Sequence, residues 1–289
     1  MRSFLFVPAD QARMFAKASE TEADALIIDL EDSVALESKQ KAREVVQQSL
    51  QQPRTDQQKW FVRINDFDTD LYLDDLAAVM PWRPDGIVLP KVNGQADIER
   101  LDHYLLAFEA AHDIPLQSTQ VIGIATETAA SVLSLASFNR DAPRRLYGLM
   151  WGAEDLAGSV GAMRNHVDGQ YTSPFRLARD LCLMAAAAAE VVAIDSICAD
   201  IRNLDRVKDE ATEAKGDGFG SKAVIHPSHI EVVNQVFTPT ADEIAWAEKI
   251  VAAFEQSPDV GVLSIDGQMI DKPHERIARN ILSRAQSKV

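Results

Sequence analysis

Short runs of β-branched and aromatic residues alternate along the chain with longer segments whose apolar residues recur at helical spacing. The first pattern is typical of buried strands and the second of amphipathic helices. The strands that we expect begin at Ser3, Ala23, Lys59, Asp85, Gln120, Arg145, Val191 and Ser221. Eight strands alternating with helices match an α/β fold of the closed (β/α)8 type, the TIM barrel, better than an open sheet.

The pattern changes after Pro239. Residues 241–257 predict a long amphipathic helix, residues 261–271 a short hairpin or loop, and residues 272–286 a terminal helix. We therefore divide the chain into a TIM-barrel domain, residues 1–239, and a C-terminal helical extension, residues 240–289.

The composition excludes several classes of protein. The chain has 289 residues, of which 46% are hydrophobic and 25% charged, as in ordinary globular proteins. Its net charge of −15 repels the phosphates of nucleic acids, so we expect no such partner. The cysteines, Cys182 and Cys198, lack the spacing of a zinc site and favour the reduced cytoplasm. No apolar run approaches the ~20 residues of a membrane span, and the N-terminal run is too soon charged for a signal peptide.

Acidic residues gather where the expected strands end, which is where the chemistry of such barrels lies. They are Asp29, Glu31, Asp32, Glu127, Glu154, Asp155 and Asp195. Carboxylates that converge on one mouth repel each other unless a cation lies among them, and oxygen ligands with few histidines favour Mg²⁺. Each of these residues also has a structural interpretation, as a helix cap or a residue of a first helical turn. Their coincidence on consecutive βα units favours the metal site.

Three further polar residues follow strands 3 and 4. Arg63 and Asn65 end the otherwise apolar run FVRIN, and Lys91 follows LP. Arg63 is interpreted as a bidentate clamp for a substrate carboxylate or as a structural salt bridge. Lys91 leaves open a Schiff base, as in a metal-independent aldolase, but a nearby metal offers the electron sink instead.

The segment GDGFGSK precedes strand 8 rather than a helix, so we interpret it as a tight structural loop and not as a phosphate cradle. This interpretation places Lys222 at the barrel rim opposite the chemistry. His226 ends strand 8 on the correct rim, where a lone histidine is more often an orienting or packing group than a catalyst.

A set of motifs in fixed order extends over the chain: RSFLFVPA, DLEDSV, VRIN, LPKV, ETA, WGAEDL, GFGSKAVIHPS and DGQMIDKP. With these motifs the sequence resembles the citrate lyase beta-subunit-like family of the HpcH/HpaI aldolase superfamily, which includes malyl-CoA, citramalyl-CoA and citryl-CoA lyases. The resemblance implies a catalytic TIM barrel and a homotrimer, with Mg²⁺ held by Glu127 and Asp155.

The resemblance also implies roles for other residues. Arg63 would bind the substrate carboxylate, and Glu31 and Asp32 would form an acidic pair near the metal shell. Phe6 and Lys17 would lie beside the coenzyme A moiety. Asp271 would be an acid or base that the C-terminal extension of a neighbouring subunit delivers to the site.

We therefore expect a Mg²⁺-dependent carbon–carbon lyase that acts on an acyl-CoA thioester with a 3-hydroxy and a 3-carboxy group. A thioesterase acting on the same acyl-CoA, a beta subunit that depends on an acyl carrier protein, and an aldolase of free 2-oxo acids are the alternatives. The acyl group, the direction of the reaction and the choice between Mg²⁺ and Mn²⁺ stay open.

Overall fold

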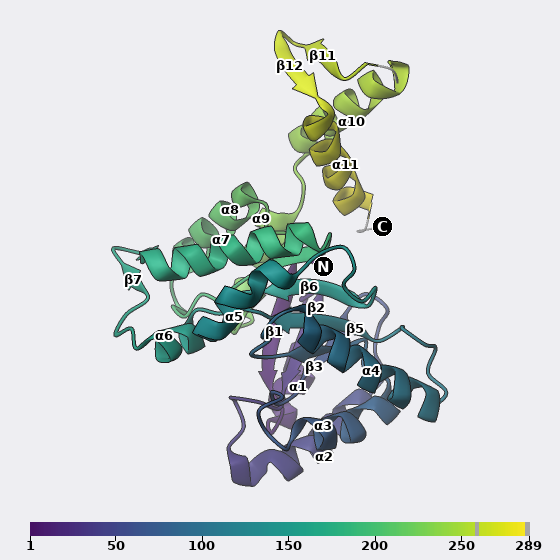
Figure 1. The fold of residues 1–289 in the computed structure, drawn as a ribbon, viewed down its shortest axis with the longest axis vertical. Helices are drawn as coiled ribbons and strands as arrows, with labels where there is room; N and C mark the ends of the chain where they lie inside the picture. The colour runs from purple at the N-terminus through teal and green to yellow at the C-terminus, as the bar shows by residue number, and fades with distance from the viewer. Residues whose placement is uncertain (258–259, 287–289) are drawn as a thin grey trace. The chain divides into compact units, whose positions relative to one another are not determined.

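A computed structural model gives the fold and describes residues 1–257 and 260–286. Within these residues, eight parallel strands close into a barrel with helices around it, which confirms the expected TIM barrel (Figure 1). The barrel strands are β1 Ser3–Pro8, β2 Ala25–Asp29, β3 Lys59–Arg63, β4 Gly86–Leu89, β5 Gln120–Ile124, β6 Leu146–Met150, β9 Val192–Asp195 and β10 Ser221–Val224. The helices up to the end of the barrel are α1 Ala12–Ala18, α2 Lys39–Leu50, α3 Tyr72–Val79, α4 Gln95–Ala111, α5 Ala129–Ser134, α6 Glu154–Val160, α7 Ser173–Ala188, α8 Leu204–Asp217 and α9 Ser228–Phe237.

Three elements of the barrel unit were not expected from the sequence. They are α1, α6 and an antiparallel hairpin of β7 (His166–Val167) and β8 (Gln170–Tyr171), which lies between α6 and α7. Each is seven residues or shorter, too short for its apolar spacing to stand out. The turn of the hairpin consists of Asp168 and Gly169, both with positive φ, as a two-residue turn of this type requires.

The interior of the barrel is one packed cluster of side chains to which every barrel strand contributes. Its buried side chains are Phe4, Ala25, Ile27, Phe61, Val88, Ile122, Ile124, Met150, Ile194 and Ala223. Phe4 and Phe61 meet edge to face, with ring centroids 5.9 Å apart. The strands are buried on both faces, as in all-parallel sheets, so helices cover their outward side chains.

The chain divides into two compact units, Met1–Asn234 and Gln235–Val289. In the second unit, α10 (Ala241–Gln256) and α11 (Lys272–Gln286) accompany a hairpin of β11 (Val262–Ile265) and β12 (Gln268–Asp271). A capping box between Thr240 and Glu243 starts α10. Ile250, Phe254 and Ile270 belong to a small core of this unit alone. The two expected helices and the hairpin are therefore present.

No helix in the described ranges is long and apolar enough to cross a membrane.

A buried polar cluster ties α2, α3 and the end of β3 together. Asp75, fully buried on α3, accepts a hydrogen bond from Arg43 Nε at 2.7 Å. Its other oxygen accepts from the backbone N–H of Asn65 at 2.8 Å and from Asn65 Nδ2 at 2.6 Å. Asn65, which the sequence placed among the polar strand ends of the mouth, is thus a structural residue that fixes the start of the β3–α3 connection.

We predict that Asp75→Ala lowers the free energy of unfolding by about 3–5 kcal/mol, because it leaves Arg43 and Asn65 without their buried partner. Urea unfolding followed by circular dichroism measures this loss. Asp74→Ala is the matched control: the Asp74 side chain is 70% exposed and 3.6 Å from Arg43, so we expect a loss below about 1 kcal/mol. Equal losses in the two variants would contradict the prediction.

Candidate active site

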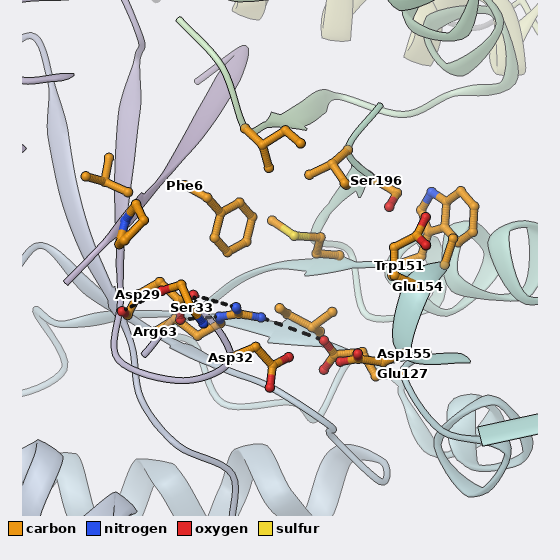
Figure 2. A pocket seen from close by; sticks show the side chains of 18 residues that line it. Phe6, Asp29, Asp32, Ser33, Arg63, Glu127, Trp151, Glu154, Asp155 and Ser196 are labelled. Atoms are coloured by element: carbon orange, nitrogen blue, oxygen red, sulfur yellow. Dashed lines mark hydrogen bonds and ion pairs between the residues drawn. The ribbon is translucent and has the colours of Figure 1, made fainter. Parts of the chain in front are cut away.

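A cavity of about 410 Å³ opens at the C-terminal ends of the strands. Its lining divides into two chemically different walls, which Figure 2 shows from close by. The polar wall contains Asp29, Asp32, Ser33, Arg63, Glu127 and Asp155, whereas Glu154 lies near Trp151. The apolar wall contains Phe6, Val7, Pro8, Ile124, Met150, Trp151, Ile197 and Ile225. The predicted convergence of strand-end carboxylates on one mouth is therefore present, and a substrate there would meet charge on one side and hydrocarbon on the other.

Arg63 is the centre of the polar wall. The parallel register places it directly beside Asp29, and its Nε and Nη2 donate to the two Asp29 oxygens at 2.7 Å each. Burial alone would raise the pKa of Asp29, but the charge and hydrogen bonds of Arg63 outweigh it and lower the pKa. Nη1 lies 2.9 Å from Glu31 Oε2 and 3.9 Å from Glu127 Oε1. The structural salt bridge is therefore real, and the Nε–Nη2 fork is occupied by Asp29 rather than free for a substrate.

The ring of Phe6 lies against the same guanidinium. The ring centroid of Phe6 is 5.1 Å from Arg63 Cζ, a cation–π contact at the edge of the cavity. In Figure 2 the ring and the guanidinium lie one above the other, with Glu127 at the far end of the ion-pair line. Arg63 is thus held by Asp29, Glu31 and Phe6 before any ligand binds.

Lys91 contacts the acidic residues with two different groups. Its side-chain Nζ bonds Glu31 and lies 3.5 Å from Asp66, while its backbone N–H donates to Glu127 Oε2 at 2.5 Å. Burial would lower the pKa of Lys91, but the hydrogen bond and charge of Glu31 outweigh it and raise the pKa. A Schiff base needs a neutral amine, so this environment opposes the metal-independent aldolase.

Glu127 and Asp155 lie next to each other in the cavity wall (Figure 2). Burial raises the pKa of Glu127 well above its usual range, and the charges of Glu31 and Asp155 raise it further. Burial and the charge of Asp32 raise the pKa of Asp155. Burial first, and then the neighbouring carboxylates, therefore disfavour the charged form of both carboxyls more than Arg63 and Lys91 favour it.

These residues fit a hard divalent cation. The donors are carboxylate oxygens, and Glu31 Oε2, which is in an ion pair with Arg63 Nη1 at 2.9 Å, is buried without a hydrogen bond to any described residue. In the part of the chain that the structure describes, no group of three or more His, Cys, Asp or Glu side chains is arranged to hold a metal by itself. Such a site suits Mg²⁺, which is usually bound by one or two carboxylates and completes its shell with water and substrate.

The segment between β6 and α6 brings Asp155 to Glu127. Thr126 Oγ1 accepts from the backbone N–H of Gly152 at 2.9 Å and donates to the Gly152 carbonyl at 3.2 Å. A side chain at Gly152 would place its Cβ 3.2 Å from Glu127 Cγ. The close approach of this segment to Glu127 thus favours glycine at position 152, which the sequence did not reveal.

The predicted positions of two residues in the last two barrel strands, Asp195 and Lys222, were wrong. Asp195 does not face the mouth, because it turns outward and bonds Lys222, at 2.6 Å, and Trp151. Lys222 belongs to β10 and is buried, and its Nζ reaches the end of β9 instead of lying at the opposite rim. Trp151, directly after β6, was missed as a cavity residue, although its position at a strand end is a signal that the sequence carries.

The other candidates lie apart from this cluster. Lys17 is exposed in the last turn of α1 and does not line the cavity. His226 accepts from the backbone N–H of Ser228 at 3.2 Å and so caps the start of α9. Asp271 belongs to the second compact unit, where it lies 2.6 Å from His274 Nδ1. The hydrogen bond from His274 lowers the pKa of Asp271.

Comparison with known proteins agrees with this geometry. The family model described as HpcH/HpaI aldolase/citrate lyase matches residues 2–227, which span the barrel strands. The chain belongs to this family. Among curated relatives, a (3S)-malyl-CoA thioesterase of Cereibacter sphaeroides is 32% identical over 99% of this chain and 95% of its own length. The citrate lyase subunit beta of Escherichia coli is 33% identical over 99% of this chain and 93% of its own.

Solved structures of relatives contain ligands. CitE of Mycobacterium tuberculosis, in complex with magnesium, acetoacetate and coenzyme A, is 32% identical with a TM-score of 0.78, covering 99% of this chain and 98% of that one. A citrate lyase beta subunit of M. tuberculosis with oxaloacetate and magnesium is 33% identical with a TM-score of 0.69, covering 82% and 96%. Relatives with this barrel have therefore been crystallised with magnesium, coenzyme A and a 2-oxo acid.

We predict that Gly152→Ala weakens the binding of Mg²⁺ by about tenfold, ~1.4 kcal/mol, because its Cβ forces Glu127 to move by a few tenths of an ångström. Isothermal titration calorimetry measures the affinity. Gly158→Ala on α6 is the control, since its Cβ would have no neighbour within 4 Å and alanine favours a helix. Binding as tight in Gly152→Ala as in the wild type would show that the contact does not position Glu127.

Proposed function

We propose that this chain is a Mg²⁺-dependent carbon–carbon lyase that cleaves or forms a 3-hydroxy-3-carboxy acyl-CoA, of the citramalyl-, malyl- or citryl-CoA type. The observation that carries the proposal is the pair Glu127 and Asp155, with raised pKa values, beside a charged Arg63 in a cavity with one apolar wall. The complexes of relatives with magnesium, coenzyme A and oxaloacetate support it.

Glu127 and Asp155 would hold the Mg²⁺, and Glu31 and Asp32 would lie around it as an acidic pair. The bound ion would lower the pKa of a substrate hydroxyl and stabilise the 2-oxo acid that forms. Glu31 Oε2, buried beside Arg63, would accept a hydrogen bond from a water molecule or from the substrate hydroxyl. These residues thereby prepare the hydroxyl to lose its proton.

Arg63 would bind the substrate carboxylate. Asp29 holds the Nε–Nη2 fork, so the contact would be made by the side of the guanidinium that carries Nη1. Because Asp29 and Phe6 already fix the Arg63 side chain, it loses little conformational entropy when the substrate binds. The fixed guanidinium can therefore orient the carboxylate, and with it the scissile bond. Phe6 and the apolar wall would lie along the acyl chain, and Lys17 beside the coenzyme A moiety.

The bond that breaks joins the carbinol carbon to the carbon next to the thioester. As it breaks, the hydroxyl proton leaves to a base, and the carbon next to the thioester takes up a proton to give acetyl-CoA. We propose Asp271 as this acid or base, delivered by the extension of a neighbouring subunit in a homotrimer. The low pKa of Asp271 beside His274 in the single chain favours the base in the direction of condensation.

Hydrolysis of the same thioester is the second candidate, because (3S)-malyl-CoA thioesterases are among the relatives. The acyl-carrier-protein-dependent beta subunit is the third, because citrate lyase beta subunits are also among them. The free thiols of Cys182 and Cys198, both buried, suit the reduced cytoplasm that we propose as the location.

The decisive experiment incubates the protein with malyl-, citramalyl- and citryl-CoA in Mg²⁺ and identifies the products by mass. The proposal expects acetyl-CoA together with glyoxylate, pyruvate or oxaloacetate. Free coenzyme A with the intact hydroxy acid would identify a thioesterase instead. Turnover that requires an added acyl carrier protein would identify the third candidate.

The metal residues give this experiment its internal control. We expect Glu127→Gln and Asp155→Asn each to lower turnover on the order of a thousandfold while the fold is retained. Asp205→Asn, an exposed residue in the first turn of another helix, should behave as the wild type. Turnover that survives a chelator would remove Mg²⁺ from the proposal.

The shared site has a test of its own. Asp271→Ala and Glu127→Gln proteins, each inactive, are unfolded together and reassembled into mixed oligomers. Activity should return, because some sites then combine an intact barrel with an intact Asp271 from a neighbour. Each variant reassembled alone should stay inactive. No recovery, although subunit exchange is shown by mass spectrometry, would mean that Asp271 serves its own barrel or is the N-cap of α11.

A further inference from the structure

A buried ion pair lies directly behind the apolar wall of the cavity. Asp195 ends β9 and is 3% exposed, and Lys222 in β10 is 1% exposed. Lys222 Nζ donates to Asp195 Oδ2 at 2.6 Å and to the carbonyl oxygen of Ser196 at 2.7 Å. Because Ser196 lines the cavity, one ammonium group connects the buried carboxylate to the loop that borders the site.

The second oxygen of Asp195 holds the neighbouring loop. Trp151 Nε1 donates to Asp195 Oδ1 at 2.7 Å. Tyr171 of the β7–β8 hairpin packs against the same indole edge to face, with centroids 4.8 Å apart. The only polar atom of the indole is therefore used away from the cavity, so Trp151 offers hydrocarbon alone to a substrate.

Trp151 begins the segment that carries Asp155. Gly152, next in the chain, is fastened to Thr126, and α6 with Asp155 in its first turn follows. Figure 2 shows Trp151 and Ser196 together on one side of the cavity and Asp155 beside Glu127 on another. The segment between β6 and α6 is thus fixed at two points, one at Thr126 and the other at Asp195.

Filling this space with an ion pair costs the desolvation free energy of two charges. Two apolar residues of similar volume are often as stabilising or more so, because they avoid the desolvation of two charges. The directed hydrogen bonds to Trp151 and Ser196 are what an apolar pair would not supply. We propose that Asp195 and Lys222 are positioning residues, which fix Trp151 and the two cavity loops so that the apolar wall and Asp155 keep their places for the substrate.

The test uses two double variants that both remove the buried charges. In Lys222→Met/Asp195→Asn the amide oxygen still accepts the hydrogen bond of Trp151, whereas in Lys222→Met/Asp195→Leu no acceptor remains. Neither protein leaves a buried ammonium without its carboxylate. Arg179, 3.7 Å from Asp195 Oδ1, keeps its ion pair with Asp217, and Glu210, 3.4 Å from Lys222 Nζ, keeps its ion pair with Arg206. The pair of variants therefore isolates the bond to Trp151 from the charges behind it.

The first readout needs no catalysis. The emission of Trp151 is obtained by subtracting the spectrum of the same protein with Trp151→Phe. The proposal expects the Leu variant to shift this emission to shorter wavelength, because the indole N–H loses its partner, while the Asn variant stays near the wild type. The same emission in both double variants would overturn the proposal.

The second readout rests on the proposed function. We expect the KM for the acyl-CoA substrate to rise about tenfold in the Leu variant and to be largely restored in the Asn variant. In the Trp151→Phe background the two variants should have the same KM, since the N–H is then absent. If the protein turns over no acyl-CoA, the proposed function is wrong. The Trp151 emission of the two double variants then tests by itself whether Asp195 and Lys222 position Trp151.

The matched control is another buried ion pair. Glu109 of α4 accepts from Arg145 Nη1 at 2.8 Å, and both side chains are fully buried. Glu109→Gln should lower stability without moving the Trp151 emission or the KM. If the double variants do not fold, Trp151→Phe alone is measured. An unchanged KM in that protein would overturn the proposal, and a raised KM would support it.

Discussion

The ion pair between Asp29 and Arg63 is the interaction on which the mouth of the barrel depends. Without Arg63, the carboxylates of Asp29, Glu31 and Glu127 would lie in one poorly hydrated space, where Lys91 and the more distant Lys39 would be left to balance them. Their mutual repulsion would favour protonation or local unfolding. The bidentate bond to Asp29 keeps the guanidinium charged and immobile, so the remaining negative charge is concentrated around Glu127 and Asp155. The fold thereby produces a place for a cation before one arrives.

The barrel could be predicted because its strands are easy to recognise in the sequence. Strands such as ALIID and GIVL are buried on both faces and therefore read as unbroken apolar runs. The same property hides which side chains face inward, since a run without alternation carries no signal of period two. The sequence located Glu127, Asp155 and Arg63 at the mouth because strand ends determine that much. It misplaced Asp195, because Ile194 points into the barrel and Asp195, as the next residue, must point outward.

What the sequence missed depends on contacts between residues far apart. Asn65 is polar and follows a strand, yet the carboxylate of Asp75, ten residues later, accepts hydrogen bonds from its backbone N–H and from its Nδ2. The role of Gly152 depends on the distance to Glu127, and that of Lys222 on the end of a neighbouring strand. No local pattern encodes such pairs. Short elements such as the β7–β8 hairpin escape for a related reason, since tertiary packing of Tyr171 on Trp151 contributes to holding the hairpin in place.

The hydrogen bond that holds Glu127 determines which substitutions the site tolerates at position 91. Oε2 of Glu127 accepts this bond from the backbone N–H of Lys91, whose φ of 52° is in the left-handed region. An amide of the backbone survives every substitution except proline, so the hold on Glu127 does not depend on the chemistry of the side chain at position 91. What matters is the shape of the turn, which glycine and asparagine adopt most readily. Mutational drift at this position could therefore discard the ammonium group and retune the charge of the mouth, while the carboxylate beside it stays in place.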